Sequence, residues 1–237
     1  MLTRTLLLVP LFLGLVQGGL QAQAQTDSVV YYVDPSSRLV VKTGKAGLFG
    51  FAGHVHVIRA NNVSGTLVYR PGQPTSRLFL KVPTESLEVL TPPDTAEIRK
   101  VTEAMRTEVL HLDKYPEMTF AADSLDARSG KMQMQLDVTM EGKTRVIPVT
   151  ADVRIGRDTI RAGGSFVAKQ TDFGIEPFRG GPGGTVKVAD KVTLCFDLVA
   201  TRTQADRAGV RHAPEGSDGR TVPGCVDNAE EAARRPM

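Results

Sequence analysis

Two histidines stand two residues apart in the stretch GLFGFAGHVHVIR, residues 47–59. If this stretch is a strand, His54 and His56 point to the same face, because side chains alternate between the two faces of a strand. A neutral imidazole donates one hydrogen bond and accepts another, so the pair could bind the backbone inside the fold or the polar head of a ligand. A metal site would need a third ligand, for which only His111 and scattered carboxylates are present.

The rest of the chain contains no catalytic motif. It has no phosphate-binding loop of the form G-x-x-x-x-G-K-[ST] and no nucleophile motif of the form G-x-S-x-G. A hydrolase built on either histidine would need a nucleophile and an orienting acid from distant strands, and the sequence singles out neither. We therefore predict no catalytic residue and no enzymatic activity.

The charge of the chain argues against one class of partner. Its 29 lysines and arginines and 26 acidic residues give a formal net charge of +3, and no stretch of the sequence is densely basic. A nucleic-acid-binding domain carries a clear basic footprint. We therefore expect no nucleic-acid partner.

The first 24 residues have the form of a secretory signal peptide. Arg4 precedes an apolar run from Leu6 to Val16, and Ala22 and Ala24 form an A-x-A signal, so we expect cleavage after Ala24. The run is too short to cross a bilayer, which takes roughly 20 residues. No later segment is long and apolar enough to do so. The mature protein should be periplasmic or secreted, and any contact with a membrane would be transient.

The two cysteines lie in different surroundings, Cys195 in a strand-like run and Cys225 in a polar tail. In an oxidising compartment they could form a disulfide, but pairing cannot be deduced from sequence. Their wide separation is unlike the close spacing of a zinc site. The sequence leaves their pairing open.

Most of the chain has the pattern of β-strands. In KMQMQLDVTME, residues 131–141, apolar and polar side chains alternate, which is typical of a strand with one buried and one wet face. EGKT predicts a turn, and RVIPVTADVRI, residues 145–155, resumes the alternation as the second strand of a hairpin. Further strands are expected at VVYYVD, RLVVKTG, HVHVIRA, NVSGTLVYR, SRLFLKVPT, IRAGGSFVAK and TVKVADKVTLCFDLVAT. Such strands close into an up-and-down barrel or pack as a sandwich.

One helix is predicted among the strands, over residues 91–110, with Thr91 as its N-cap and prolines at its first positions. Its apolar residues, at steps of three and four, form one stripe, so the helix should lie on the fold as a lid or plug at one end. They are Ile98, Val101, Met105 and Val109. Residues 203–237 have almost no apolar periodicity and much glycine, proline and charge, which predicts a disordered polar tail.

Four stretches, in order, resemble the YceI-like family of exported lipid- and polyisoprenoid-binding proteins. They are LFGFAGHVHVI with the following GTLVYRPGQPTSRLFLKVPTESLEV, then EVLHLDKYPEMTFAADSL, then MEGKTRVIPVTADV, and finally QTDFGIEPFRGGPGGTVKVADKVTLCFDLVA. The last is the most specific, through Phe173, Gly174, Ile175, Val188, Asp190 and Val192. The resemblance runs from about Val30 to Thr201.

The resemblance implies an all-β fold with one helix: a lipocalin-like, eight-stranded antiparallel β-barrel over residues 25–202, with the helix capping or flanking one end. It implies a non-catalytic carrier or sequestering protein for an isoprenoid lipid, such as a polyprenyl phosphate or a quinone-like amphiphile, with no cofactor required. The alternative is a metal- or redox-linked accessory protein that uses His54 and His56. The sequence gives no oligomeric state.

The candidate ligand-binding residues are the two histidines and the side chains expected to wall a cavity in the barrel. A small barrel can enclose one ligand, and methionines on its inward face adapt well to a chain-like molecule. The same side chains could instead fill a solid core, and the pattern alone does not decide. The candidates are His54, His56, Phe49, Phe51, Phe120, Met132, Met134, Leu136, Val138, Val149, Phe166 and Phe173. No metal ligand set is predicted.

Overall fold

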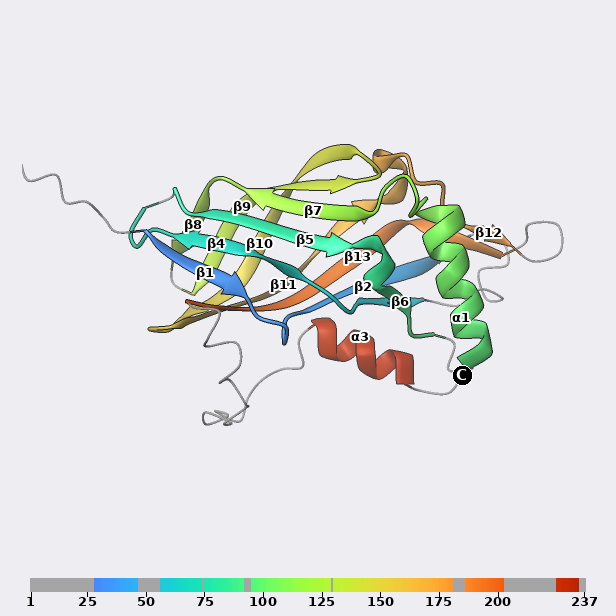
Figure 1. Ribbon diagram of the computed structural model, residues 1–237, viewed down its shortest axis with the longest axis horizontal. Coiled ribbons are helices and arrows are strands. Elements are labelled where there is room, and N and C mark those ends of the chain that lie inside the picture. Colours follow the sequence, from blue (N-terminus) through green and yellow to red (C-terminus); the bar gives the residue numbers. More distant parts are fainter. Residues whose placement is uncertain are drawn as a thin grey trace, which may run out of the picture.

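One antiparallel sheet dominates the computed structural model, which describes residues 28–46, 56–73, 75–91, 95–128, 130–180, 186–202 and 225–234 (Figure 1). Its strands are β1 (Val29–Val33), β2 (Arg38–Ala46), β3 (Val57–Ala60), β4 (Ser64–Tyr69), β5 (Arg77–Pro83), β6 (Leu87–Val89), β7 (Glu117–Ala122), β8 (Leu125–Arg128), β9 (Lys131–Met140), β10 (Lys143–Ile155), β11 (Thr159–Lys169), β12 (Arg179–Gly180) and β13 (Val186–Thr201). Eight strands pair in the order β1-β4-β5-β7-β9-β10-β11-β13, and β13 pairs back to β1. The predicted eight-stranded antiparallel barrel is confirmed.

The strand β13, 16 residues long, closes the ring. One of its edges pairs with the whole of β11, and the other pairs with β2 and with β1. Between β1 and β2 the chain turns, and the N–H of Ser37 donates to the carbonyl oxygen of Asp34 at 2.9 Å. Beyond β2, the strands β3 and β6 continue the sheet outside the ring. A 3₁₀ turn, η2 (Thr84–Ser86), joins β5 to β6.

The β9–β10 hairpin shows how the inward face becomes apolar. Met140 pairs with Lys143 across a two-residue turn, in which Glu141 and Gly142 have φ angles of 47° and 69°. Positive φ at both central residues defines a type I′ turn, whose twist matches that of the strands it joins. Counting back from this turn, every second residue of β9 is buried inside the ring and the residues between them face outward. The alternation predicted for residues 131–141 is confirmed.

The strands β10 and β11 pair with each other only between residues 151–155 and 160–164. Over the rest of their length they are not hydrogen-bonded to each other, although β10 still pairs with β9 and β11 with β13. Pro148 pairs with Gln135 of β9 but lies where β10 has no partner in β11, and proline has no N–H that would be left without an acceptor there. The 3₁₀ turn η4 (Gln170–Phe173) packs against both strands and carries the buried ring of Phe173. Side chains, rather than ladder hydrogen bonds, therefore close the barrel wall at this place.

The predicted helix is α1 (Thr95–Ala104), which continues into one π-helical turn, η3 (Met105–Val109). It lies across one end of the barrel (Figure 1). The hydroxyl of Thr102 accepts the N–H of Val89 at 3.0 Å, and this contact joins the helix to β6. Within the parts of the chain that the structure describes, no helix is long and apolar enough to span a membrane.

The C-terminal region corrects the prediction of a disordered tail. Residues 225–234 form a second helix, α3 (Cys225–Arg234), which packs against β2, β3 and β13 (Figure 1). The two sides of this contact form an apolar cluster of their own: Val40, Val57, Cys195, Val226, Ala229 and Ala233. The helix contributes a stripe with steps of three and four residues, but the stripe is short and alanine-rich, so it gives little hydrophobic signal in the sequence. Residues 203–224 and 235–237 lie outside the described parts.

A disulfide between Cys195 of β13 and Cys225 joins α3 to the barrel, which answers the pairing question that the sequence left open. Arg38 adds three ion pairs, to Asp197 of β13 at 2.7 Å and to Asp227 and Glu230 of α3 at 2.6 and 3.8 Å. The side chains of Arg38, Asp197 and Asp227 are partly exposed, and exposed ion pairs contribute little to stability; Glu230 is more buried, but its contact with Arg38 is the longest of the three. The disulfide is therefore the main anchor of α3.

Replacing Cys195 and Cys225 by alanine should lower the free energy of unfolding by about 3–4 kcal/mol, because the bond closes a loop of 30 residues in the unfolded chain. Urea denaturation of the double variant and of the wild type measures this difference. Asp227→Asn keeps the disulfide and loses one exposed ion pair, so this control should lose less than about 1 kcal/mol. Equal stability of the double variant and the wild type would show that the bond does not hold α3.

Candidate functional site

Among the residues that the structure describes, two apolar cavities adjoin each other, one inside the ring of strands and one between the ring, β3, β6 and η3. The first has a volume of about 70 Å³. Its lining is Val33, Leu39, Val63, Leu67, Leu78, Leu80, Phe120, Leu125, Met132, Met134, Leu136, Val149, Ala151, Ile160, Ala162, Phe166, Phe196, Leu198 and Ala200. The second, next to η3, has a volume of about 90 Å³. Its lining is Leu39, Val41, Thr43, Ile58, Ala60, Val82, Leu87, Met105, Val109, Leu110, Met118, Phe120, Met140, Gln170, Ile175, Val192 and Leu194.

Phe120 of β7 stands between the two cavities and belongs to both linings. It is buried and lies directly opposite Val138 of β9. Leu39 of β2 also touches both cavities, from another side of the ring. A change of rotamer at Phe120 would therefore alter the connection between the two spaces.

The described lining carries no charge. The first cavity is lined by apolar side chains throughout, and the second has two polar ones, Thr43 and Gln170. The Thr43 hydroxyl accepts the backbone N–H of His56 at 3.0 Å, and the side-chain amide of Gln170 donates to the carbonyl oxygen of Ala189 at 2.9 Å. The hydroxyl proton of Thr43 and the side-chain carbonyl of Gln170 are the groups that an occupant could meet. An ionised group would be strongly disfavoured in such surroundings.

The two volumes limit what the barrel holds without rearrangement. Each cavity far exceeds the roughly 10–15 Å³ that one water molecule needs, yet both lie below the roughly 300 Å³ at which pockets for drug-sized molecules begin. A larger occupant therefore requires lining side chains to move. Five of the seven methionines of the chain lie in these linings. Methionine side chains are unbranched and polarizable, so they change shape at little cost.

The structure brings six of the predicted ligand-binding residues together around the first cavity: Phe120, Met132, Met134, Leu136, Val149 and Phe166. Val138 and Phe173 are buried and belong to neither of these two linings. Val138 faces inward as the alternation predicts and pairs directly with Phe120 on the neighbouring strand. Phe173 lies on η4, where β10 and β11 are not paired. Phe49, Phe51 and His54 lie outside the described residues.

His56 lies just before β3, on the same side of the chain as Ile58 and Ala60, which line the second cavity. Its Nδ1 is 2.8 Å from the carbonyl oxygen of Thr91. Because a carbonyl oxygen only accepts, Nδ1 carries the proton, and Nε2 of the neutral ring is left as an acceptor. The hydroxyl of Thr91, expected as a helix N-cap, accepts the N–H of Val57 at 2.9 Å. His56 thus links β3 to the segment before α1 through a hydrogen bond to the backbone.

His111, the candidate third metal ligand, bonds to an acidic side chain instead. Its Nδ1 is 2.6 Å from Oε1 of Glu141, and this contact ties the segment after η3 to the β9–β10 turn. Both residues have positive φ angles, 43° and 47°. No three histidine, cysteine, aspartate or glutamate side chains of the described residues are grouped so that they could hold a metal ion.

Asp190 of β13 holds η4 beside the second cavity. Its carboxylate accepts the N–H and the hydroxyl of Thr171, both at 2.9 Å. The backbone hydrogen bond from Thr171 is the main cause that lowers the pKa of Asp190 below its ordinary value, because it stabilises the charged form. The contact is therefore present at neutral pH and is lost as the pH falls through the lowered pKa.

Most lining residues outside β9 were not among the predicted candidates. Leu39, Val41 and Thr43 follow the same alternation as β9, so the position of Thr43 could have been found from period two alone. Gln170 follows the end of a strand, and no pattern in the sequence marks it. Its position depends on how η4 folds back toward β13, which is a tertiary feature.

The fold and the cavities define a class: a closed, lipocalin-like antiparallel barrel with an uncharged interior. The YceI-like domain matches residues 31–200, and the chain belongs to this family. The match ends before α3, so the disulfide-linked helix lies outside the family domain. No curated protein matches the chain in sequence.

Two solved structures share this fold. BcnA from Burkholderia cenocepacia aligns with a TM-score of 0.56 at 18% identity, over 71% of this chain and 99% of that chain. A polyisoprenoid binding domain from Saccharophagus degradans, implicated in plant cell wall breakdown, aligns with a TM-score of 0.54 at 16% identity, over 75% of this chain and 100% of that chain. At these identities the similarity shows the fold alone.

His56→Phe should lower the free energy of unfolding by about 1 kcal/mol, the scale of one hydrogen bond, because phenylalanine cannot donate to the carbonyl of Thr91. His56→Gln keeps a donor and should lose less. Chemical denaturation of both variants measures the difference. If the two variants unfold at the same denaturant concentration as the wild type, the hydrogen bond to Thr91 has no structural role.

Proposed function

We propose that this protein is a non-catalytic carrier or sequestering protein that binds an isoprenoid lipid inside its barrel. The observation that carries the proposal is the uncharged lining of the two adjoining cavities, which suits a hydrocarbon chain and opposes an ion. The protein of known structure from Saccharophagus degradans, similar in fold, is itself described as a polyisoprenoid binding domain. Membership of the YceI-like family agrees with this function.

The shape of the lining favours a slender, methyl-branched chain over a compact ring system. The two small cavities adjoin each other, with Phe120 as the shared wall, so a chain that displaces this ring could occupy both. The methionines around it can follow the bends of an isoprenoid. Thr43 and Gln170 offer a hydroxyl and an amide but no charge. An uncharged head, such as a quinone, therefore fits the described lining better than a phosphate does.

We further propose that the protein acts outside the cytoplasm, in a periplasm or as a secreted protein. Residues 1–24, predicted as a signal peptide, lie outside the described residues. The disulfide between Cys195 and Cys225 supports export, because structural disulfides persist in oxidising compartments and are rare in the cytosol.

No observation favours the metal- or redox-linked alternative that uses His54 and His56. Nδ1 of His56 is occupied by Thr91, and His54 lies outside the described residues. Both cysteines of the chain are in the disulfide.

Native mass spectrometry of the protein purified from its own host tests the proposal. We expect a bound mass that extraction into organic solvent identifies as an isoprenoid, because the uncharged cavities retain apolar molecules. Refolding the emptied protein with prenyl alcohols of increasing length should give occupancy that rises until the cavities are filled. A bound metal with no lipid, or a barrel that takes up no prenyl alcohol of any length, would contradict the function.

Two substitutions on one face of β9 separate the cavity from the packed wall. Met134→Trp should fill the first cavity and weaken prenyl binding with little loss of stability, because Met134 lines that space. Val138→Trp should instead overpack the fully buried wall beside Phe120 and cost about 1–3 kcal/mol of stability. Prenyl titration and urea denaturation of both variants measure the two effects. Unchanged lipid retention by folded Met134→Trp would count against a ligand in this cavity.

A further inference from the structure

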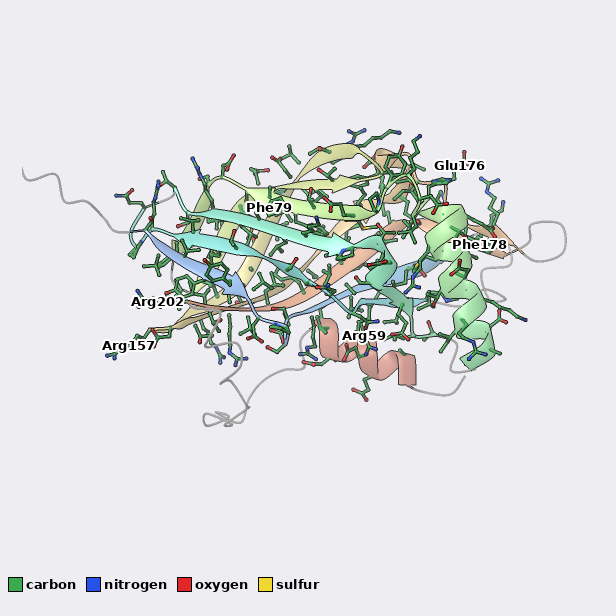
Figure 2. All side chains as sticks on the ribbon, in the orientation of Figure 1. Arg59, Phe79, Arg157, Glu176, Phe178 and Arg202 are labelled. Atoms are coloured by element: carbon green, nitrogen blue, oxygen red, sulfur yellow. A yellow bond between two sulfur atoms is a disulfide. The ribbon has the colours of Figure 1, made fainter. Side chains whose placement is uncertain are left out.

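A cationic surface surrounds the β10–β11 turn. Arg157 lies in this turn, and Figure 2 shows it at the end of the barrel opposite α1. Arg154 of β10 pairs directly with Arg161 of β11. Both strand arginines are exposed on the outer face, because the alternation buries Val153 and Ile160 on the inner one.

The three arginines have no acidic partner among the residues that the structure describes. The two carboxylates nearest to them in sequence are already in ion pairs with other cations. Asp152 lies 2.5 Å from the ammonium of Lys131, and Asp158 lies 3.5 Å from the guanidinium of Arg202. The positive charge of Arg154, Arg157 and Arg161 is therefore open to solvent.

The fold itself has no need of these charges. Like charges directly opposite each other on neighbouring strands destabilise a sheet, and Arg154 and Arg161 are such a pair. Neutral polar side chains would serve both exposed positions without this repulsion. A like-charge pair that weakens the sheet and stabilises nothing else is expected where the surface has a function.

An apolar side chain at the same tip indicates which kind of surface the arginines meet. Ile155 ends β10 next to Arg154 and is 43% exposed. Cations with an exposed apolar side chain suit the interface of an anionic bilayer, where the cations meet headgroups and the apolar group enters the boundary below them. An acidic protein would use the charges but would gain nothing from Ile155.

We propose that Arg154, Arg157, Arg161 and Ile155 dock this protein onto an anionic phospholipid bilayer. The inference rests on the proposed function, because a carrier of an isoprenoid lipid must meet a membrane to load or release it. The first cavity reaches this hairpin, since Ile160 of β11 lines it from the inner face. The opposite end of the barrel is covered by α1 (Figure 1). Docking through the hairpin thus brings the end of the barrel opposite α1 to the lipid.

Sedimentation of the full mature protein with vesicles tests this surface. Vesicles of phosphatidylglycerol and phosphatidylcholine in equal parts should bind the wild type, and phosphatidylcholine alone should not; added salt should weaken the binding. Arg154→Gln with Arg161→Gln should weaken it about 20–30-fold, from roughly fivefold for each arginine near the surface. Ile155→Ser should weaken binding while leaving its salt dependence unchanged.

The matched control removes the same charge at the other end of the barrel. Arg99→Gln with Lys100→Gln changes two exposed cations of α1 and should leave vesicle binding unchanged. Failure of the wild type to bind anionic vesicles, or equal binding by the Arg154 and Arg161 double variant, would overturn the docking surface. A third outcome would also overturn it: Ile155→Ser binds vesicles as well as the wild type, and soluble polyglutamate competes with the vesicles. The surface would then serve an acidic protein.

Native mass spectrometry of the same samples separates this inference from the function on which it rests. A double variant that keeps its isoprenoid but no longer sediments with vesicles supports the docking surface. A wild type that sediments through these arginines but never holds an isoprenoid would overturn the proposed function and leave the docking surface in place.

Discussion

The pairing of β13 along both of its edges is the constraint on which the rest of the structure depends. One edge meets β11 and the other meets β2 and β1, and this second contact turns a row of strands into a ring. Closing the ring removes the free edges that would otherwise expose backbone hydrogen-bonding groups. It also creates an interior where apolar side chains from every strand of the ring face each other. Without this closure neither cavity would exist.

The same strand separates two apolar regions. Side chains at Leu194 and Phe196 face the barrel interior, whereas Cys195 between them faces outward to α3. The outer region is small, so it relies on a covalent bond to keep its helix in place. The inner region is larger and holds the cavities. The alternation of side chains along β13 thus places one set in the candidate ligand site and the other against α3, a helix outside the family domain.

The charges of the molecule are separated from its apolar interior. None lines the described cavities, and the arginines of the β10–β11 hairpin stand on the outer face. Burying an unpaired charge would cost far more than any ligand contact could return, so recognition inside the barrel is left to shape and to two neutral polar groups. The ion pairs of Arg38 lie outside the two cavities. This division suits a molecule that holds an apolar cargo and presents a polar exterior.

The sequence by itself determined most of the long strands, their inward faces, the β9–β10 hairpin and the single helix before β7, because these follow from local periodicity and turn chemistry. It did not predict β7, which carries Phe120, or the short strands β6, β8 and β12. The family followed from motifs that can be read along the chain. Only the tertiary structure decided that Met134 lines the first cavity while Val138 is fully buried beside Phe120, that Cys195 pairs with Cys225, and that His56 bonds to Thr91. Each of these contacts depends on a residue that the fold brings near from a distant part of the chain. Strand periodicity and secondary-structure propensity are local and carry no information about such partners.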